Sequence, residues 1–207
     1  RALHGLKQTR GKRIVAIGGA GGWGAGGQKA PQIARDLWKL DIVDCSYKDL
    51  EPRLKAAKED SGLVKRCRAA AGRYLAQSRV SLHTARPFLD NAFVLTEVMK
   101  DIMDEARTDA ITVHHCMGTI MGMSDTTACM PLSVLNDEGY LAFCESDFVV
   151  VPSGMAVGSY APSVEIRGSE NGVRFASSIA IADPVGVQEP SQLAIPSTTV
   201  LPAPLVT

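Results

Sequence analysis

Two carboxylates, Glu145 and Asp147, stand two residues apart in the segment CESD, between the apolar residues 141–144 and 148–151. Acidic side chains are costly to bury in such surroundings unless a cation or a hydrogen-bond network compensates their charge. The segment is therefore open to two interpretations. It is either a strand that ends in a solvated turn or a strand end that presents a carboxylate to a metal ion.

The composition argues against several classes of protein. The 207 residues include 22 Lys and Arg against 22 Asp and Glu, so no global positive field favours nucleic acid or an anionic membrane. The longest apolar run, at residues 148–151 with its flanks, is too short to cross a bilayer. Five cysteines without a CxxC pair, and no secretory signal at the start, predict reduced thiols in a soluble cytoplasmic protein.

A glycine-rich loop follows the first predicted strand. Arg13–Ile17 is a β-branched run, residues 18–27 read GGAGGWGAGG, and residues 30–40 have helical spacing. Such a loop can present backbone amides to an anion, or it can serve only to allow positive φ angles and close helix packing. Trp23, a large aromatic among glycines, suits stacking on a ligand ring or a subunit contact. The predicted helix places Ile33, Leu37 and Leu40 on one face.

Alternating strands and helices continue along the chain. Strands are predicted at Asp41–Cys45, 109–113 and 140–143, and helices at 47–58, 63–77, 88–106 and 128–135, the last with an N-cap in residues 124–127. This order predicts an α/β fold with a doubly wound, mostly parallel sheet. Ligands bind outside the carboxyl ends of the strands in such folds, so Glu145, Cys116 and Trp23 are expected to converge at one edge.

The segment after the strand at residues 109–113 begins with His114, His115 and Cys116. Adjacent residues of a strand point to opposite sides, and no second ligand pair follows at a zinc-site spacing, so structural zinc is disfavoured. Cys116 is also a poor candidate nucleophile because the sequence identifies no Asp or Asn to orient a base.

Several motifs resemble the L-fucose and L-arabinose isomerase superfamily, in particular fucose-isomerase-like sugar isomerases. They are VAIGGAGGWGAGG, DIVDCSYKDLEPRLK, CMGTI and TACMPLSVLNDEGYLAFCESDFVVVPSG, which together span residues 12–154. The resemblance implies a subunit of three domains in a homo-oligomer. Residues 1–12 would then be a linker, 13–154 the middle domain, and 155–207 a divergent or truncated tail of the third domain.

The same resemblance implies an aldose–ketose isomerase that moves a proton through an enediol with the help of a divalent cation, usually Mn²⁺. Glu145 would be the metal ligand and an acid/base group, which agrees with the oxygen ligands that manganese prefers. Asp147 would orient its neighbours. The residues expected to wall a monosaccharide substrate are Gly22, Trp23, Cys116 and Met117.

The sequence departs from this family after Gly154. The family's second metal ligand, an aspartate in an Asn-Asp-Pro-Thr motif, would fall at Ser169, and no histidine follows His115 to serve as the third. Asp183 lies too far along unless an insertion is assumed, and the tail predicts at most a hairpin near residues 170–172. We therefore expect this chain alone to be an incomplete isomerase and at most a weak metal binder. The alternatives are a nucleotide- or sugar-phosphate-binding module that uses residues 18–27, and a regulatory or structural pseudo-subunit.

Overall fold

The protein contains a parallel sheet with helices on both faces, as seen in a computed structural model that describes residues 2–77 and 80–160. Four strands form the sheet: β1 (Arg13–Ile17), β2 (Asp41–Cys45), β3 (Ala110–Val113) and β4 (Leu141–Cys144). All three pairings are parallel and the strand order is β2-β1-β3-β4. The predicted α/β, doubly wound fold is confirmed.

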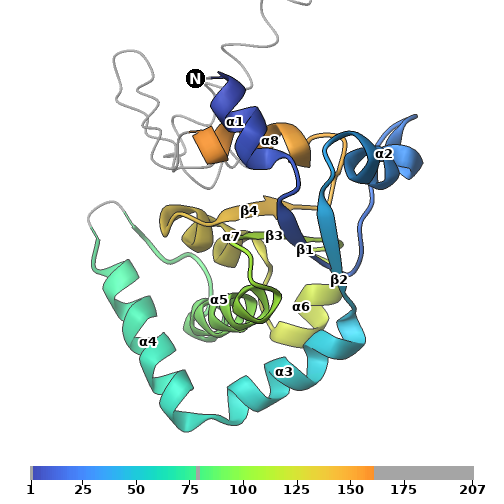
Figure 1. Ribbon diagram of the computed structural model, residues 1–207. Helices are drawn as coiled ribbons and strands as arrows, with labels where there is room; N and C mark the ends of the chain where they lie inside the picture. Colours follow the sequence, from blue (N-terminus) through green and yellow to red (C-terminus); the bar gives the residue numbers. More distant parts are fainter. Residues whose placement is uncertain (1, 78–79, 161–207) are drawn as a thin grey trace, which may run out of the picture.

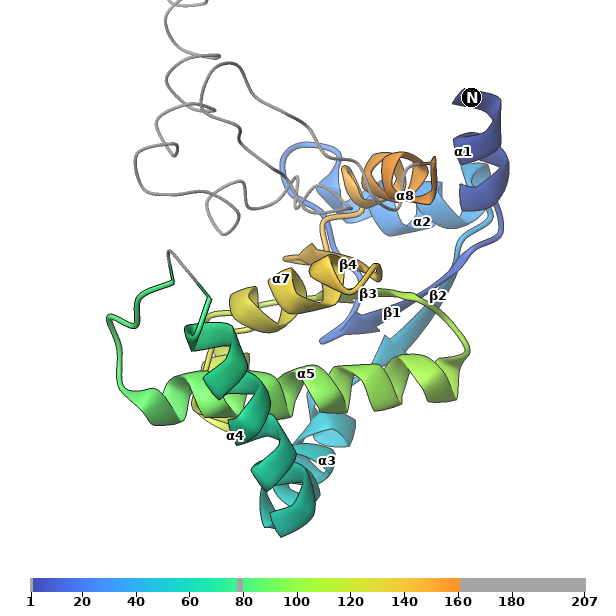
Figure 2. The same cartoon turned by 90° about the vertical axis from the view of Figure 1, so that its left-hand side faces the viewer.

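The helices divide between the two faces of the sheet (Figures 1 and 2). They are α1 (Ala2–Thr9), α2 (Ala30–Leu37), α3 (Tyr47–Glu59), α4 (Ser61–Leu75), α5 (Arg86–Ala106), α6 (Thr119–Ser124), α7 (Cys129–Asp137) and α8 (Val151–Tyr160), with a 3-10 turn η1 (Gly27–Lys29) before α2. Helices α1, α2 and α8 lie on one face, and α3, α5 and α6 lie on the other. Among the described residues, none of the helices combines the length and apolarity needed to span a membrane.

The alternation of side chains along β1 explains why both faces are covered. Ile14 and Ala16 belong to a core cluster with residues of α2 and α8, whereas Val15 and Ile17 pack with α3, α5 and α7. Successive side chains of a strand point to opposite faces, so an uninterrupted apolar run needs helices on both sides. All four side chains are fully buried.

The outer edge of β4 is closed by one side chain of α7. Asn136 donates a hydrogen bond from Nδ2 to the Ala142 carbonyl (2.9 Å) and accepts one at Oδ1 from the Ala142 N–H (3.1 Å). The N–H of the neighbouring residue, Leu141, points to the inner side of β4 and donates to the carbonyl of Asp109, which precedes β3. Asn136 therefore takes the place of a further strand at an edge that would otherwise expose backbone groups.

Two predicted details of the helices are wrong. Ile33 and Leu37 were expected on the core face of α2 but are 51% and 65% exposed, whereas Ala30 and Ala34 are buried. The small residues Ala30 and Ala34 pack in the cluster that contains Ile14 and Ala16 of β1, and the larger residues lie on the other side of the helix. The N-cap expected in residues 124–127 is also absent, because Ser124 ends α6 and α7 begins at Cys129 after an Ala128 without a side-chain cap.

The two ends of the described region differ from expectation as well. The stretch expected to be a linker, residues 1–12, contains α1, which packs against α8. The folded core was expected to end near Ser153, but α8 continues to Tyr160 and Met155 is fully buried. The hairpin expected near residues 170–172, Ser169 and Asp183 lie outside the described residues.

Candidate functional site at the carboxyl ends of the strands

The strand order changes direction at β1. From β1 the chain moves to β2 on one side, and it later enters β3 on the other side of β1. Ligands of open α/β sheets bind outside the carboxyl ends of the strands at such a reversal. Three segments leave the sheet here: residues 18–27 after β1, 114–118 after β3 and 145–150 after β4.

The glycine loop and the CESD turn are joined by backbone hydrogen bonds. The Gly21 N–H donates to the Ser146 carbonyl (3.1 Å), and the Phe148 N–H donates to the Gly21 carbonyl (3.0 Å). Asp147 adds a side-chain contact, because its Oδ1 accepts a hydrogen bond from the Trp23 N–H (3.2 Å). The orienting role of Asp147 stays a prediction.

Glu145 occupies a strained turn directly after β4. Glu145 and Ser146 have φ angles of +64° and +48°, in the left-handed region that side chains with a Cβ rarely adopt. The Glu145 Oε1 accepts a hydrogen bond from the Cys116 thiol (3.0 Å), which joins the ends of β3 and β4. Ser146 Oγ is buried without a hydrogen-bond partner among the described residues. Strain and an unpaired buried hydroxyl in one turn are features that cluster at functional sites.

Tyr47 and His114 belong to the same site, although the sequence did not single out Tyr47. The Tyr47 hydroxyl donates to the His114 carbonyl, and the His114 ring bonds through Nδ1 to the Glu145 carbonyl (3.2 Å). The carbonyl can only accept, so His114 Nδ1 carries the proton. Burial, and then the nearby charge of Glu145, raise the pKa of Tyr47. A tyrosine at the start of a helix carries no sequence signal of such a role.

Gly18 leaves the space that Tyr47 fills. Its φ angle is +76°, and a Cβ at this position would overlap the Tyr47 ring and hydroxyl. Gly22 and Gly27 also approach each other so closely that a Cβ on Gly22 would lie 2.6 Å from the Gly27 carbonyl oxygen. The glycines at these positions therefore have a structural reason, which was one of the two interpretations of the loop.

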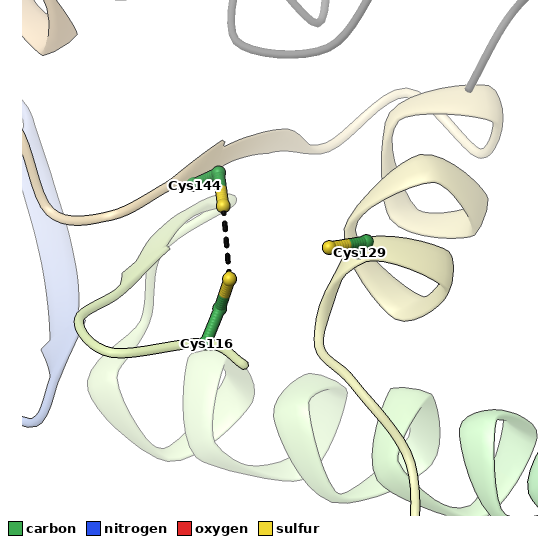
Figure 3. Close-up of side chains that lie close together, drawn as sticks. All are labelled: Cys116, Cys129 and Cys144. Atoms are coloured by element: carbon green, nitrogen blue, oxygen red, sulfur yellow. Dashed lines mark hydrogen bonds between the residues drawn. The ribbon is translucent and has the colours of Figure 1, made fainter. Parts of the chain in front are cut away.

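The thiols of Cys116, Cys129 and Cys144 lie close together (Figure 3). The Sγ atoms of Cys116, Cys129 and Cys144 lie within 4.8 Å of one another, and the distance between Cys116 and Cys144 is 3.3 Å. Burial, followed by the hydrogen bond to Glu145, raises the pKa of Cys116 to about 12. The hydrogen bond with Cys129 and then burial raise the pKa of Cys144 above its ordinary value. The thiols of Cys116 and Cys144 are therefore neutral at pH 7, which counts against Cys116 as a nucleophile.

The residues predicted to bind substrate differ in their exposure. Trp23 and Met117 are 63% and 61% exposed, Gly22 is half-buried, and Cys116 is only 2% exposed. The structure brings Trp23, Cys116 and Glu145 to the same edge of the sheet through the contacts described above. Cys116, however, lies below the surface and contacts Glu145 and Cys144, so its position differs from that expected for a wall of the site.

A cavity of about 570 Å³ lies elsewhere, between the connection from α4 to α5 and helices α6 and α7. Apolar side chains such as Leu82, Phe88 and Met130 line it. The functional assignment favours the strand edge, because charged and polar groups converge there and the backbone is strained there.

The fold and this site define the class of the protein: an α/β domain with a polar site at the carboxyl ends of a doubly wound parallel sheet. No protein-family model matches the chain, and no curated protein matches it either. A more specific function is therefore a matter of proposal.

Proposed function

We propose that the strand edge binds a monosaccharide and that Glu145 is the acid/base group of an aldose–ketose isomerase, of which this chain is a part. The observation that carries the proposal is the carboxylate of Glu145 at the end of β4, held by Cys116 at 3.0 Å beside the loop that bears Trp23. The resemblance to sugar isomerases supports the same residue.

The proposed reaction needs a base at one oxygen of Glu145. The carboxylate takes the proton from the carbon next to the aldose carbonyl while water protonates the carbonyl oxygen, which gives the enediol. The hydroxyl of the neighbouring carbon then loses its proton to water as Glu145 returns its own proton to the former carbonyl carbon, which gives the ketose. No electrons are exchanged with another molecule. The Cys116 thiol holds Oε1, and we assign the proton transfer to Oε2. Cys116 thus becomes a positioning residue.

The other predicted residues have distinct tasks in this proposal. The exposed ring of Trp23 stacks on the apolar face of the sugar, and Gly22 and Met117 lie at the rim. Asp147 keeps the Trp23 backbone in place through the hydrogen bond of 3.2 Å. Loss of the hydrogen bond from Trp23 to Asp147 would displace the Trp23 ring but leave Glu145, the proposed base, in place.

The resemblance also implies a manganese ion, with Glu145 as a ligand. Manganese takes about six hard donors, mainly oxygen. The neighbouring Asp147 already accepts hydrogen bonds at Oδ1 from the N–H groups of Trp23 and Val149. Among the described residues, the candidate ligands that lie close together in a group of at least three are Cys116, Cys129 and Cys144. These residues offer sulfur and not the oxygen donors that manganese prefers. The described residues do not form a manganese site, and the proposed reaction uses the carboxylate alone.

The contacts of the glycine loop disfavour the nucleotide-binding alternative. The N–H groups of Gly18, Gly21 and Trp23 are bonded to Cys45, Ser146 and Asp147 in turn, so they do not face an open anion site. The Asp147 carboxylate at the loop would also repel a phosphate.

Ligand-observed NMR with a panel of aldoses, ketoses, NAD and ATP tests the proposal on the 207-residue chain. We expect saturation transfer to sugars, lost in Trp23→Ala and weakened in Glu145→Gln, and unchanged in the control Glu51→Gln, which alters an exposed carboxylate on α3. A response to nucleotides but not sugars would refute the proposal. Equal sugar signals in wild type and Trp23→Ala would refute the assigned site.

We further propose a cytoplasmic homo-oligomer. All five cysteines are thiols without disulfides, as in proteins of a reducing compartment. Ile33 and Leu37 form an exposed apolar pair on α2 that suits a subunit contact. Light scattering of the wild type and Ile33→Glu tests the oligomer, and a monomeric wild type would contradict it.

A further inference from the structure

The three thiols of the strand edge come from segments that are distant in sequence but rigidly placed. Cys116 follows β3, Cys129 is the first residue of α7, and Cys144 is the last residue of β4. In Figure 3 the sulfur of Cys129 points toward the other two. Cys116 is 2% exposed and the other two are half-buried.

The distances between these sulfurs match a thiolate metal centre. A zinc–sulfur bond of about 2.3 Å places the sulfurs of a tetrahedral site about 3.8 Å apart. Here the three Sγ atoms lie within 4.8 Å of one another and the pair Cys116–Cys144 is at 3.3 Å. Small rotations of the side chains would suffice to equalise the three separations.

We propose that Cys116, Cys129 and Cys144 bind one thiophilic cation of the zinc or cadmium class. Oε1 of Glu145 lies 3.0 Å from the Cys116 sulfur but not within 4.8 Å of all three sulfurs, so the fourth position is left to a solvent molecule. The inference rests on the thiol geometry and does not depend on sugar binding.

The electrostatics of the cluster agree with a cation of this kind. The charge of a bound divalent cation would compensate the negative charge of three neighbouring thiolates. Cys129 also lies at the N-terminus of α7, where the helix dipole favours a negative charge. Manganese would gain little, because it prefers oxygen to sulfur.

Cobalt titration of the reduced, chelator-treated 207-residue chain provides the test. Thiolate-to-cobalt charge-transfer absorption should appear, saturate at one equivalent and disappear when zinc displaces cobalt. Each of Cys116→Ser, Cys129→Ser and Cys144→Ser should weaken zinc binding at least about tenfold. Cys67→Ser is the matched control, since Cys67 is equally buried, in α4, outside the cluster, and should bind as the wild type does.

A second measurement uses the unaltered protein, so it does not depend on the folding of variants. The alkylation of the half-buried Cys129 and Cys144 is measured by mass spectrometry with and without added metal. Zinc should slow this alkylation, whereas manganese should not. Absence of the charge-transfer band, or unchanged alkylation with zinc, would overturn the inference. So would an equal loss of affinity in Cys67→Ser. Failure of sugar binding in the NMR experiment would leave these readouts untouched, so the two proposals can fail separately.

Discussion

Replacement of Asn136 by alanine should detach the edge of the sheet from α7. The side chain is 2% exposed and makes two hydrogen bonds with the backbone of Ala142, at 2.9 and 3.1 Å. Ala142 is also 2% exposed, so water cannot replace the lost partners without local opening. Each buried backbone group left unpaired costs about 1–3 kcal/mol.

Two such groups give an expected loss of about 3 kcal/mol in the free energy of unfolding, after partial relaxation of the edge. For a protein of this size that corresponds to a melting temperature lower by about 6–12 °C. Urea denaturation followed by circular dichroism measures the first quantity, and a thermal scan measures the second. Hydrogen exchange should also show faster exchange at the Ala142 amide.

Asn91→Ala is the control for this prediction, because Asn91 is a half-buried asparagine on α5 away from the sheet edge. A change within about 0.5 kcal/mol is expected there. If Asn136→Ala cost less than about 1 kcal/mol, or no more than the control, Asn136 would not be closing the edge of β4 and the reasoning would be refuted.

Three further substitutions test other parts of the fold. Gly18→Ala should cost about 1–3 kcal/mol through its positive φ and its overlap with Tyr47, and an undiminished loss in a Tyr47→Ala background would contradict the steric part. Met155→Ala should cost about 2–5 kcal/mol in urea denaturation, whereas a neutral effect would place Met155 outside the core. The hydrogen bond from Arg53 lowers the pKa of Glu105 in the folded protein below its ordinary value of 4.5. The ionised Glu105 therefore stabilises the folded state above pH 4.5, and this contribution to the free energy of unfolding is lost as the pH falls through the lowered pKa. Glu105→Gln should therefore flatten the acid side of the stability profile, and an unchanged profile would exclude this contribution.

Much of the fold could be predicted from local sequence, because the strands are short apolar runs, three of them with β-branched residues such as Arg13–Ile17, that end at glycine or polar residues. The alternation of these runs with helical segments permits few topologies besides a parallel sheet. Since the strands are parallel, their carboxyl ends share one edge, and this is why Glu145, Cys116 and Trp23 could be expected together. The chemical roles of these residues remain predictions.

Contacts between distant segments could not be predicted in this way. The thiols of Cys116, Cys129 and Cys144 have no metal-ligand spacing in sequence, and they meet only because β3, α7 and β4 pack together. Tyr47 reaches His114 because Gly18 leaves room for its ring. Periodicity grouped Ile33 and Leu37 on one face of α2, but packing buries Ala30 and Ala34 instead and leaves that face exposed.

The sequence by itself thus determined the four strands, helices α2, α3, α4, α5 and α7, their order and the edge of the sheet that carries the chemistry, because these follow from local preferences and the parallel topology. The tertiary structure alone decided which side chains touch at that edge, and with what charge and exposure. Cys116 shows the difference: its position after β3 was readable from the sequence, but its burial beside Glu145 and its contact with Cys144 depend on how two strand ends and a helix pack. Such packing sums many weak contacts between residues far apart in the chain, and no local pattern records it.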